Sequence, residues 1–169
     1  MHLVHNTLAG KCWQEKGLAN TAVLASNTGR RRISIIGAIN SMTKKFSGLV
    51  TEANCDKEAI KAQLAIIRQD YPDNKEIIIF WDNAKYQRAY ETQACAKTLN
   101  ITLIFLPPYS PNLNLIERMW KFFKKKIRNK YREKFQEFLD ASVEICAQLD
   151  KEYLPEVSNL INHKFHILM

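Results

Sequence analysis

Two uninterrupted apolar segments constrain the fold of this chain more than any other feature. The first, Glu76–Trp81, reads EIIIFW, and the second, Ile101–Leu106, reads ITLIFL. Continuous apolar runs of this length are typical of strands that are buried on both faces of a sheet. The residues between them, Ala89–Leu99, are expected to form a helix, so this part of the chain alternates strand, helix and strand.

The residues before these segments predict further strands and one more helix. Ala22–Ala25, Arg32–Ile39 and Phe46–Thr51 are short apolar or β-branched runs, and we expect them to form an antiparallel meander. Over Asp56–Tyr71, apolar residues instead recur every three or four positions among polar ones. That spacing predicts an amphipathic helix.

The residues after the second apolar segment predict two helices. Pro107 and Pro108 end the strand, because proline lacks the N–H group that a sheet requires. A helix is expected to start near Asn114 and to turn an apolar stripe toward the sheet. The stripe consists of Ile116, Trp120, Phe123 and Ile127. We interpret Trp120 and Phe123 as core residues rather than base-stacking platforms. The last helix is expected over Phe135, Phe138, Leu139, Cys146 and Leu149.

The order of these elements predicts an α/β protein with a ribonuclease-H-like fold, in which helices flank a mixed five-stranded sheet. The chain has 169 residues, of which 46% are hydrophobic and 25% charged, and this composition suits a globular domain. No internal repeat, linker or low-complexity segment interrupts the sequence. We therefore expect residues 1–169 to form a single domain.

The charge of the chain favours either a polyanionic partner such as nucleic acid or an anionic surface, and charge alone does not choose between them. The sequence contains 25 Lys and Arg residues against 17 Asp and Glu residues, which gives a formal net charge of +8. Nine of the basic residues lie between Arg118 and Lys134, where Glu133 is the one acid. On a helix this segment would present a positive face that binds DNA phosphates, although a solvated helix face is the alternative interpretation.

Other features of the sequence argue against several classes of protein. The four cysteines are far apart and form no CxxC pair, which argues against a zinc ribbon or a thioredoxin-type redox site. His2 and His5, like His163 and His166, have HxxH spacing without a convincing third ligand, so we expect surface or hydrogen-bonded histidines. The sequence has no signal peptide and no apolar run of membrane-spanning length, which predicts a soluble, cytoplasmic protein without a membrane partner.

Two carboxylates lie where reacting groups collect in α/β proteins, beyond the carboxyl ends of strands. Asp82 directly follows the first apolar segment, and Glu117 lies at the start of the helix after the second, with 34 residues between them. Both could therefore reach the same end of the sheet and hold divalent ions, which activate water and neutralise the leaving oxygen in phosphodiester cleavage. Taken singly, each has another interpretation: Asp82-Asn83 is a turn sequence, and Glu117 has capping-box spacing from Asn114.

The residues around these two carboxylates form two motifs. Residues 78–84 read IIFWDNA, and residues 106–121 read LPPYSPNLNLIERMWK. They resemble bacterial insertion-sequence transposases of the mariner superfamily, in which a hydrophobic strand ends in Asp-Asn-Ala and an LPPYSPxLNxIExxW element carries the last acidic residue. The resemblance extends through residues 28–30, 37–40 and 162–165, so it covers nearly the whole chain. Gln87 and Leu115 stand where many members have His and Pro, but neither replaces an acidic ligand.

This resemblance implies a DDE, integrase-like catalytic domain that cuts the ends of a DNA element and joins the freed 3′-hydroxyl to target DNA. Asp82 would be the second catalytic Asp and Glu117 the closing Glu, both as ligands of Mg²⁺, with Mn²⁺ as a substitute. The protein would bind element ends and target DNA as a homodimer and would be nucleoid-associated when bound. The residues implied to shape the site are Asn83, Tyr109, Ser110 and Asn114. Those expected to bind DNA phosphates are Arg118, Lys121, Lys124, Lys125, Lys126 and Arg128.

The first carboxylate of a DDE triad has no obvious counterpart in this sequence. In related sequences it ends the first strand in a segment like DxxHxxHN, whose latter part matches His2–Asn6, so this Asp would fall just before Met1. Glu15, Glu52 and Asp56 end no clear core strand and are not expected to replace it. We therefore expect a chain that lacks the start of its first strand and an upstream helix-turn-helix region, and that is inactive or nearly so.

Two other functions are compatible with the same residues. A non-catalytic remnant would bind DNA or associate with full-length transposase, and its DNA binding would survive the loss of Asp82. A different ribonuclease-H-like nuclease would cleave RNA-containing duplexes rather than duplex DNA.

Overall fold

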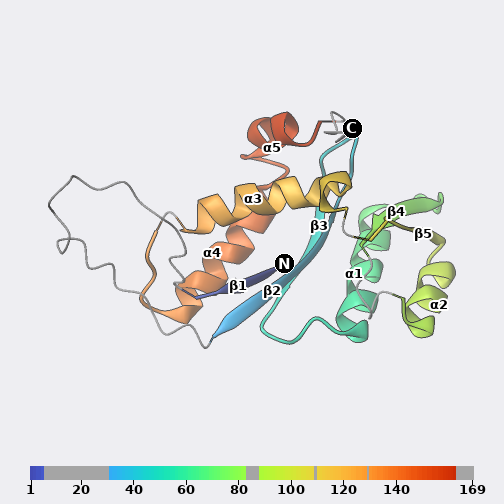
Figure 1. Ribbon diagram of the computed structural model, residues 1–169, viewed down its shortest axis with the longest axis horizontal. Helices are drawn as coiled ribbons and strands as arrows, with labels where there is room; N and C mark the ends of the chain where they lie inside the picture. The colour runs from blue at the N-terminus through green and yellow to red at the C-terminus, as the bar shows by residue number, and fades with distance from the viewer. Residues whose placement is uncertain (6–30, 83–87, 109, 129, 163–169) are drawn as a thin grey trace, which may run out of the picture.

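The computed structural model describes residues 1–5, 31–82, 88–108, 110–128 and 130–162 of the chain. Five strands, five α-helices and one 3₁₀ helix follow one another within these residues (Figure 1). The strands are β1 (His2–Val4), β2 (Arg32–Ile39), β3 (Phe46–Thr51), β4 (Ile77–Trp81) and β5 (Ile101–Phe105). The helices are α1 (Lys57–Asp70), α2 (Tyr90–Thr98), the 3₁₀ helix η2 (Pro111–Leu113), α3 (Leu115–Arg128), α4 (Phe135–Gln148) and α5 (Leu154–Leu160).

The strands form two sheets rather than the single five-stranded sheet that the sequence predicts. β1, β2 and β3 form an antiparallel sheet, and β4 and β5 pair in parallel, with Ile77 opposite Ile101. The cause is the length of β1, which has three residues and, together with Met1, pairs only with residues 32–35 of β2. Within the described part of the chain, Ile36–Ile39 therefore has no partner strand on the side of β2 that pairs with β1. The outer edge of β4, which is the edge that does not face β5, has no partner strand among these residues either.

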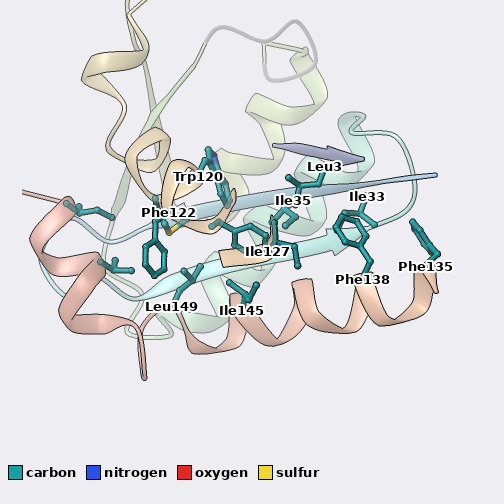
Figure 2. Close-up of a cluster of buried hydrophobic side chains, with 14 residues drawn as sticks. Leu3, Ile33, Ile35, Trp120, Phe122, Ile127, Phe135, Phe138, Ile145 and Leu149 are labelled. Atoms are coloured by element: carbon teal, nitrogen blue, oxygen red, sulfur yellow. The ribbon is translucent and has the colours of Figure 1, made fainter. Parts of the chain in front are cut away.

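The larger core lies between the three-stranded sheet and the helices α3 and α4 (Figure 2). Ile33 and Ile35 of β2 are fully buried in one cluster with Trp120 and Phe123 of α3, and α4 contributes Phe138. Full burial of a large apolar side chain stabilises a fold by about 1.5–3 kcal/mol. The prediction that Trp120 and Phe123 are core residues is thus confirmed.

Helix α1 covers the opposite face of the three-stranded sheet and joins it to the two-stranded sheet (Figure 1). The helix begins after Asp56, whose carboxylate accepts a hydrogen bond from the Ala59 N–H at 2.9 Å, as an N-cap residue does. Gln63 of α1 is buried and donates its Nε2 to the Ser47 carbonyl oxygen of β3 at 2.7 Å. Leu64 lies in a second apolar cluster with residues of α2, β4 and β5. The two sheets are therefore held through one helix.

The apolar strands β4 and β5 are buried on one face only, so the prediction of burial on both faces is wrong. Ile77 and Ile79 pack toward the cluster formed with α1 and α2. On the opposite face, Ile78 and Phe80 of β4 are 54% and 62% exposed, and Ile104 of β5 is 41% exposed. Alternate residues of a strand point to opposite faces, and the helices α1 and α2 cover only one of them.

The predicted helices and the other predicted strands agree with the structure to within a few residues at their ends. The predicted strand Ala22–Ala25 lies outside the described residues. The sequence periodicity does not predict β1 or α5, because segments of three and seven residues are too short to show a repeat.

Two further expectations from the sequence concern the cysteines and membrane-spanning segments. Cys55, Cys95 and Cys146 are free thiols, and burial raises the pKa of the Cys146 thiol to about 12, which makes it chemically inert. Cys12 lies outside the described residues. No helix in the described ranges is both long and apolar enough to cross a bilayer.

Candidate active site

Asp82 is the first residue after β4 and is exposed to solvent. The end of this strand is held in place, because the Leu106 N–H donates a hydrogen bond to the Trp81 carbonyl oxygen at 2.7 Å. This bond continues the parallel pairing of β4 with β5 by one residue beyond Phe105. Asp82 therefore lies at the carboxyl end of a paired strand, next to the segment that leaves β5.

Glu117 lies in the first turn of α3 and is half-buried. The turn is built on Asn114, whose carbonyl oxygen accepts the Glu117 N–H at 3.1 Å and whose side-chain oxygen accepts the Ile116 N–H at 3.4 Å. The Asn114 N–H is itself bonded to the Pro111 carbonyl oxygen at 3.1 Å. A capping box would need that N–H for the Glu117 carboxylate, so the carboxylate is not used in this way.

The two carboxylates line one pocket of about 170 Å³, although they are far apart in the sequence. Ser110 and Asn114 line the same pocket, so four of the six predicted catalytic and site-shaping residues come together. Asn83 and Tyr109 lie outside the described residues. The other residues that line the pocket are not among the predicted site residues. All of them lie in the second motif, and they are Leu106, Pro107, Pro108 and Pro111.

The chain's first residue also lies within electrostatic reach of this pocket. The Met1 ammonium group donates a hydrogen bond to the Ile35 carbonyl oxygen at 2.6 Å. Burial lowers the pKa of this ammonium group, and the negative charges of Glu117 and Asp82 act in the opposite direction. Because both carboxylates affect the same group, the start of β1 is close to the candidate site.

The pocket offers hard oxygen donors, which is the ligand chemistry that Mg²⁺ and Mn²⁺ prefer. Mg²⁺ keeps several of its water molecules and is often held by only one or two carboxylates, so Asp82 and Glu117 fit such an ion. No set of three His, Cys, Asp or Glu residues within the described ranges is placed to share a metal. Glu52 pairs with Arg31 at 2.9 Å and Asp56 caps α1, so neither replaces a third ligand. Glu15 lies outside the described residues.

The histidines that the structure describes are hydrogen-bonded, as the sequence predicts. His2 lies 3.0 Å from the Ser34 hydroxyl through its Nδ1 atom. His5 is buried, and its Nε2 atom lies 2.8 Å from the Arg132 carbonyl oxygen. His163 and His166 fall outside the described residues.

A row of basic side chains begins at Glu117 and follows α3. Lys121, Lys124 and Arg128 are four, seven and eleven residues after Glu117, so they share its face of the helix. Lys121 and Arg128 are exposed, and the neighbouring Lys125 is exposed as well. Lys124 is half-buried, so three of these four predicted DNA-binding residues are directed to solvent.

Two other residues of the predicted DNA-binding set contact α5 and the residues that follow it. Arg118 donates from Nη1 to the carbonyl oxygen of Asn162 at 2.9 Å and to its side-chain oxygen at 3.2 Å. Lys126 pairs with Glu156 at 3.2 Å and lies 4.3 Å from the centre of the Tyr153 ring. The sequence gives no sign of these contacts, because it does not predict α5.

Comparisons with known proteins identify the family of this chain. The model of the DDE superfamily endonuclease family matches residues 2–140. The uncharacterized protein y4pE/y4sA of Sinorhizobium fredii (strain NBRC 101917 / NGR234) is 33% identical over 118 residues, which are 69% of this chain and 82% of that protein.

Two solved structures of the Mos1 transposase are similar in fold. The Mos1 strand transfer complex has a TM-score of 0.64 at 13% identity, over 97% of this chain and 53% of that one. The Mos1 mariner paired-end complex with Mn has a TM-score of 0.59 at 15% identity, over 93% and 52%. The chain thus spans about half the length of these structures. This likeness supports the predicted ribonuclease-H-like α/β class, and the family match over most of the chain shows that it belongs to the DDE superfamily endonucleases.

Proposed function

We propose that this chain carries the catalytic core of a mariner-type DDE transposase, which cuts element ends and transfers the strand to target DNA. The observation that carries this proposal is the shared pocket of Asp82 and Glu117. Membership of the DDE endonuclease family and a fold like that of Mos1 support it.

In the proposed mechanism Asp82 and Glu117 would hold a divalent ion, either Mg²⁺ or Mn²⁺. Such an ion would supply an activated water molecule and stabilise the charge on the leaving oxygen. The chain's own residues keep the two carboxylates in position: the β4–β5 pairing holds Asp82, and the Asn114 turn holds Glu117. The proline-rich wall of the pocket narrows the space in which a phosphodiester can lie. We also assign Asn83, Tyr109 and Ser110 to the shape of this site.

The basic row on α3 provides a path for the DNA backbone in this proposal. Lys121, Lys124 and Arg128 extend from Glu117 over a distance of about 16 Å, given a rise of about 1.5 Å per residue. Phosphate contacts of this kind fix the position of DNA without reading its sequence. Lys125 would add to the same contact surface. Action as a homodimer on DNA, and a cytoplasmic location with nucleoid association when bound, are parts of the same proposal.

A strand upstream of Met1 would supply both the third carboxylate and the pairing that Ile36–Ile39 and β4 do not have among the described residues. Such a strand would continue β1 along the open edge of Ile36–Ile39, because Met1 already bonds to Ile35. It would end near Asp82, whose charge acts on the Met1 ammonium group. The strand could thereby join β2 to β4 in one five-stranded sheet, with an Asp directly before Met1 beside the other two carboxylates. The chain without this carboxylate is expected to be inactive or nearly so.

The test compares the chain with a version extended by a short apolar strand that ends in Asp directly before Met1. Nicking of element-end DNA in Mg²⁺ or Mn²⁺ is expected from the extended protein only. Replacing the added Asp by Asn, or making Asp82→Asn in the extended protein, should lower the rate by at least about a hundredfold, since each removes a metal ligand.

Each alternative function has its own outcome in this experiment. Salt-dependent DNA binding that survives Asp82→Asn, without cleavage by any extended protein, would identify a non-catalytic DNA-binding remnant. Cleavage of RNA–DNA hybrids but not of duplex DNA would identify a different ribonuclease-H-like nuclease. Nicking by the unextended chain would contradict the expected inactivity.

A further inference from the structure

Arg118 is the residue next to Glu117, and three of its hydrogen bonds reach the end of α5 and the residue that follows it. Its Nη1 atom donates to the Asn162 carbonyl oxygen at 2.9 Å, to the Asn162 side-chain oxygen at 3.2 Å and to the Leu160 carbonyl oxygen at 3.3 Å. From these contacts we infer that Arg118 is a positioning residue that ties α5 to the first turn of α3 and thereby fixes Glu117. This inference rests on the proposed function, in which Glu117 holds a metal ion.

Helix α5 needs such a contact because it is short. It has seven residues, and isolated helices of this length are not stable in water. The last carbonyl groups of a helix have no partner within the helix, and a nearby Arg can satisfy them and interact favourably with the helix dipole. The Leu160 carbonyl belongs to the last residue of α5. Arg118 therefore binds the C-terminal end of the helix, where an additional hydrogen-bond donor stabilises the helix most.

The remaining contacts show that α3 and α5 form one packed unit. Val157 and Ile161 are fully buried in the main core. Lys126 pairs with Glu156, and the Tyr153 ring meets Phe122 of α3 edge-to-face at a centroid distance of 5.6 Å. The Lys126 and Phe122 contacts hold the start of α5, whereas Arg118 holds its end, next to the candidate site.

The link to Glu117 follows from the geometry of a helix start. First turns fray unless side chains or neighbouring elements hold them. The first turn of α3 is capped by Asn114, but the hydrogen bond that the Asn114 side-chain oxygen accepts from the Ile116 N–H is long, at 3.4 Å. Successive helix residues point about 100° apart, so Glu117 can face the pocket while Arg118 faces α5. Through its bonds to Leu160 and Asn162, Arg118 anchors this turn to the end of α5.

The residues that support the candidate site then extend beyond the part of the chain that matches the family model. The match ends at residue 140, whereas the acceptors of Arg118 belong to Leu160 and Asn162. The segment 154–162 would then be part of the support for the site. The positioning role also separates Arg118 from the residues proposed to contact DNA phosphates.

The first experiment measures how DNA binding by the full chain depends on salt, for Arg118→Ala, Arg118→Lys and the control Lys121→Ala. A lost phosphate contact lowers the slope of log affinity against log salt by about 1. Lys121→Ala is expected to show this change, and Arg118→Ala is expected to leave the slope unchanged. A slope lowered by Arg118→Ala as much as by Lys121→Ala would overturn the inference.

The second experiment measures amide hydrogen exchange and Mn²⁺ affinity in the same proteins. Arg118→Ala should speed exchange at residues 157–162 and 115–118 and weaken Mn²⁺ binding about tenfold, as loss of an outer support of a metal site does. Arg118→Lys keeps one charged donor nitrogen and should restore part of both properties, and it replaces the Ala variant if that variant fails to fold. Unchanged exchange at either segment, or unchanged Mn²⁺ affinity, contradicts the positioning role. If the parent binds neither Mn²⁺ nor DNA, the proposed function fails, while the exchange data still decide whether Arg118 holds α5 and the α3 turn.

Discussion

The Phe46 ring lies across Gly37 and Gly48, which face each other in β2 and β3. A Cβ atom at either glycine would overlap this ring, and at Gly37 it would also lie 3.3 Å from the Trp120 ring. The Phe46 ring cannot move away freely, because it meets Trp120 edge-to-face at a centroid distance of 6.0 Å. At the scale of single residues, the absence of two side chains therefore makes room for the contact between β3 and α3.

Gly37→Ala is expected to lower the free energy of unfolding by about 1–3 kcal/mol, the usual cost of overfilling a packed site. Urea denaturation measures this loss. In the double variant with Phe46→Leu, the smaller side chain should remove most of the overlap, so the two losses should not add. Additive losses would show that the Phe46 ring is not what excludes a side chain at residue 37.

At the scale of secondary-structure elements, a charged group joins the β2–β3 hairpin to the end of α1. Asp70 pairs with Lys45 at 2.8 Å and accepts a hydrogen bond from the Ser47 hydroxyl at 2.5 Å. Burial acts to raise the pKa of the Asp70 carboxyl, but the bonds from Lys45 and Ser47 outweigh it, so this pKa lies below its usual value. The ionised form of Asp70 therefore stabilises the folded chain.

Because the pKa of Asp70 is lower in the folded than in the unfolded chain, its stabilisation is present near neutral pH and is lost on acidification through the folded-state value. Asp70→Asn should cost about 0.5–1 kcal/mol at pH 7, since the partly exposed Lys45 weakens the pair, and less as the pH falls below 4. Denaturation at several pH values measures this difference. The control is Asp73→Asn, which removes an exposed pair with Lys75 and should change little. A constant loss at all pH values would contradict the assignment.

The sequence predicts those elements whose side chains repeat over several turns or several alternations. The stripe that includes Trp120 and Phe123 predicts α3, and the Asp-Asn-Ala and proline-rich motifs locate both carboxylates of the pocket. It does not predict α5, because seven residues show no repeat and the helix depends on contacts with α3. The role of Arg118 is missed for the same reason, since two of its three acceptors are backbone carbonyl groups, which leave no trace in the sequence.

At the scale of the whole molecule, the open edge of β4 and its uncovered face lie together. Ile78, Phe80 and Ile104 form this apolar face, and no strand in the described ranges pairs with the outer edge of β4. The strand reads IIIFW and has no charge or proline, which are the features that keep an edge strand from pairing with another chain. The sequence predicts this strand but not its exposure, because exposure depends on which other elements pack against its face and pair with its edge.

The chain is therefore expected to self-associate through β4 at micromolar concentration, which sedimentation velocity measures. Phe80→Lys places a charge on the uncovered face and should shift the protein toward monomers, as charged residues on edge strands do. Met42→Lys is the matched control, because Met42 is 78% exposed in the β2–β3 turn rather than in β4, and should change nothing. The version with a strand added before Met1 should also be more monomeric, since that strand would occupy the edge of β4. Association that persists in both Phe80→Lys and the extended protein would show that another surface is responsible.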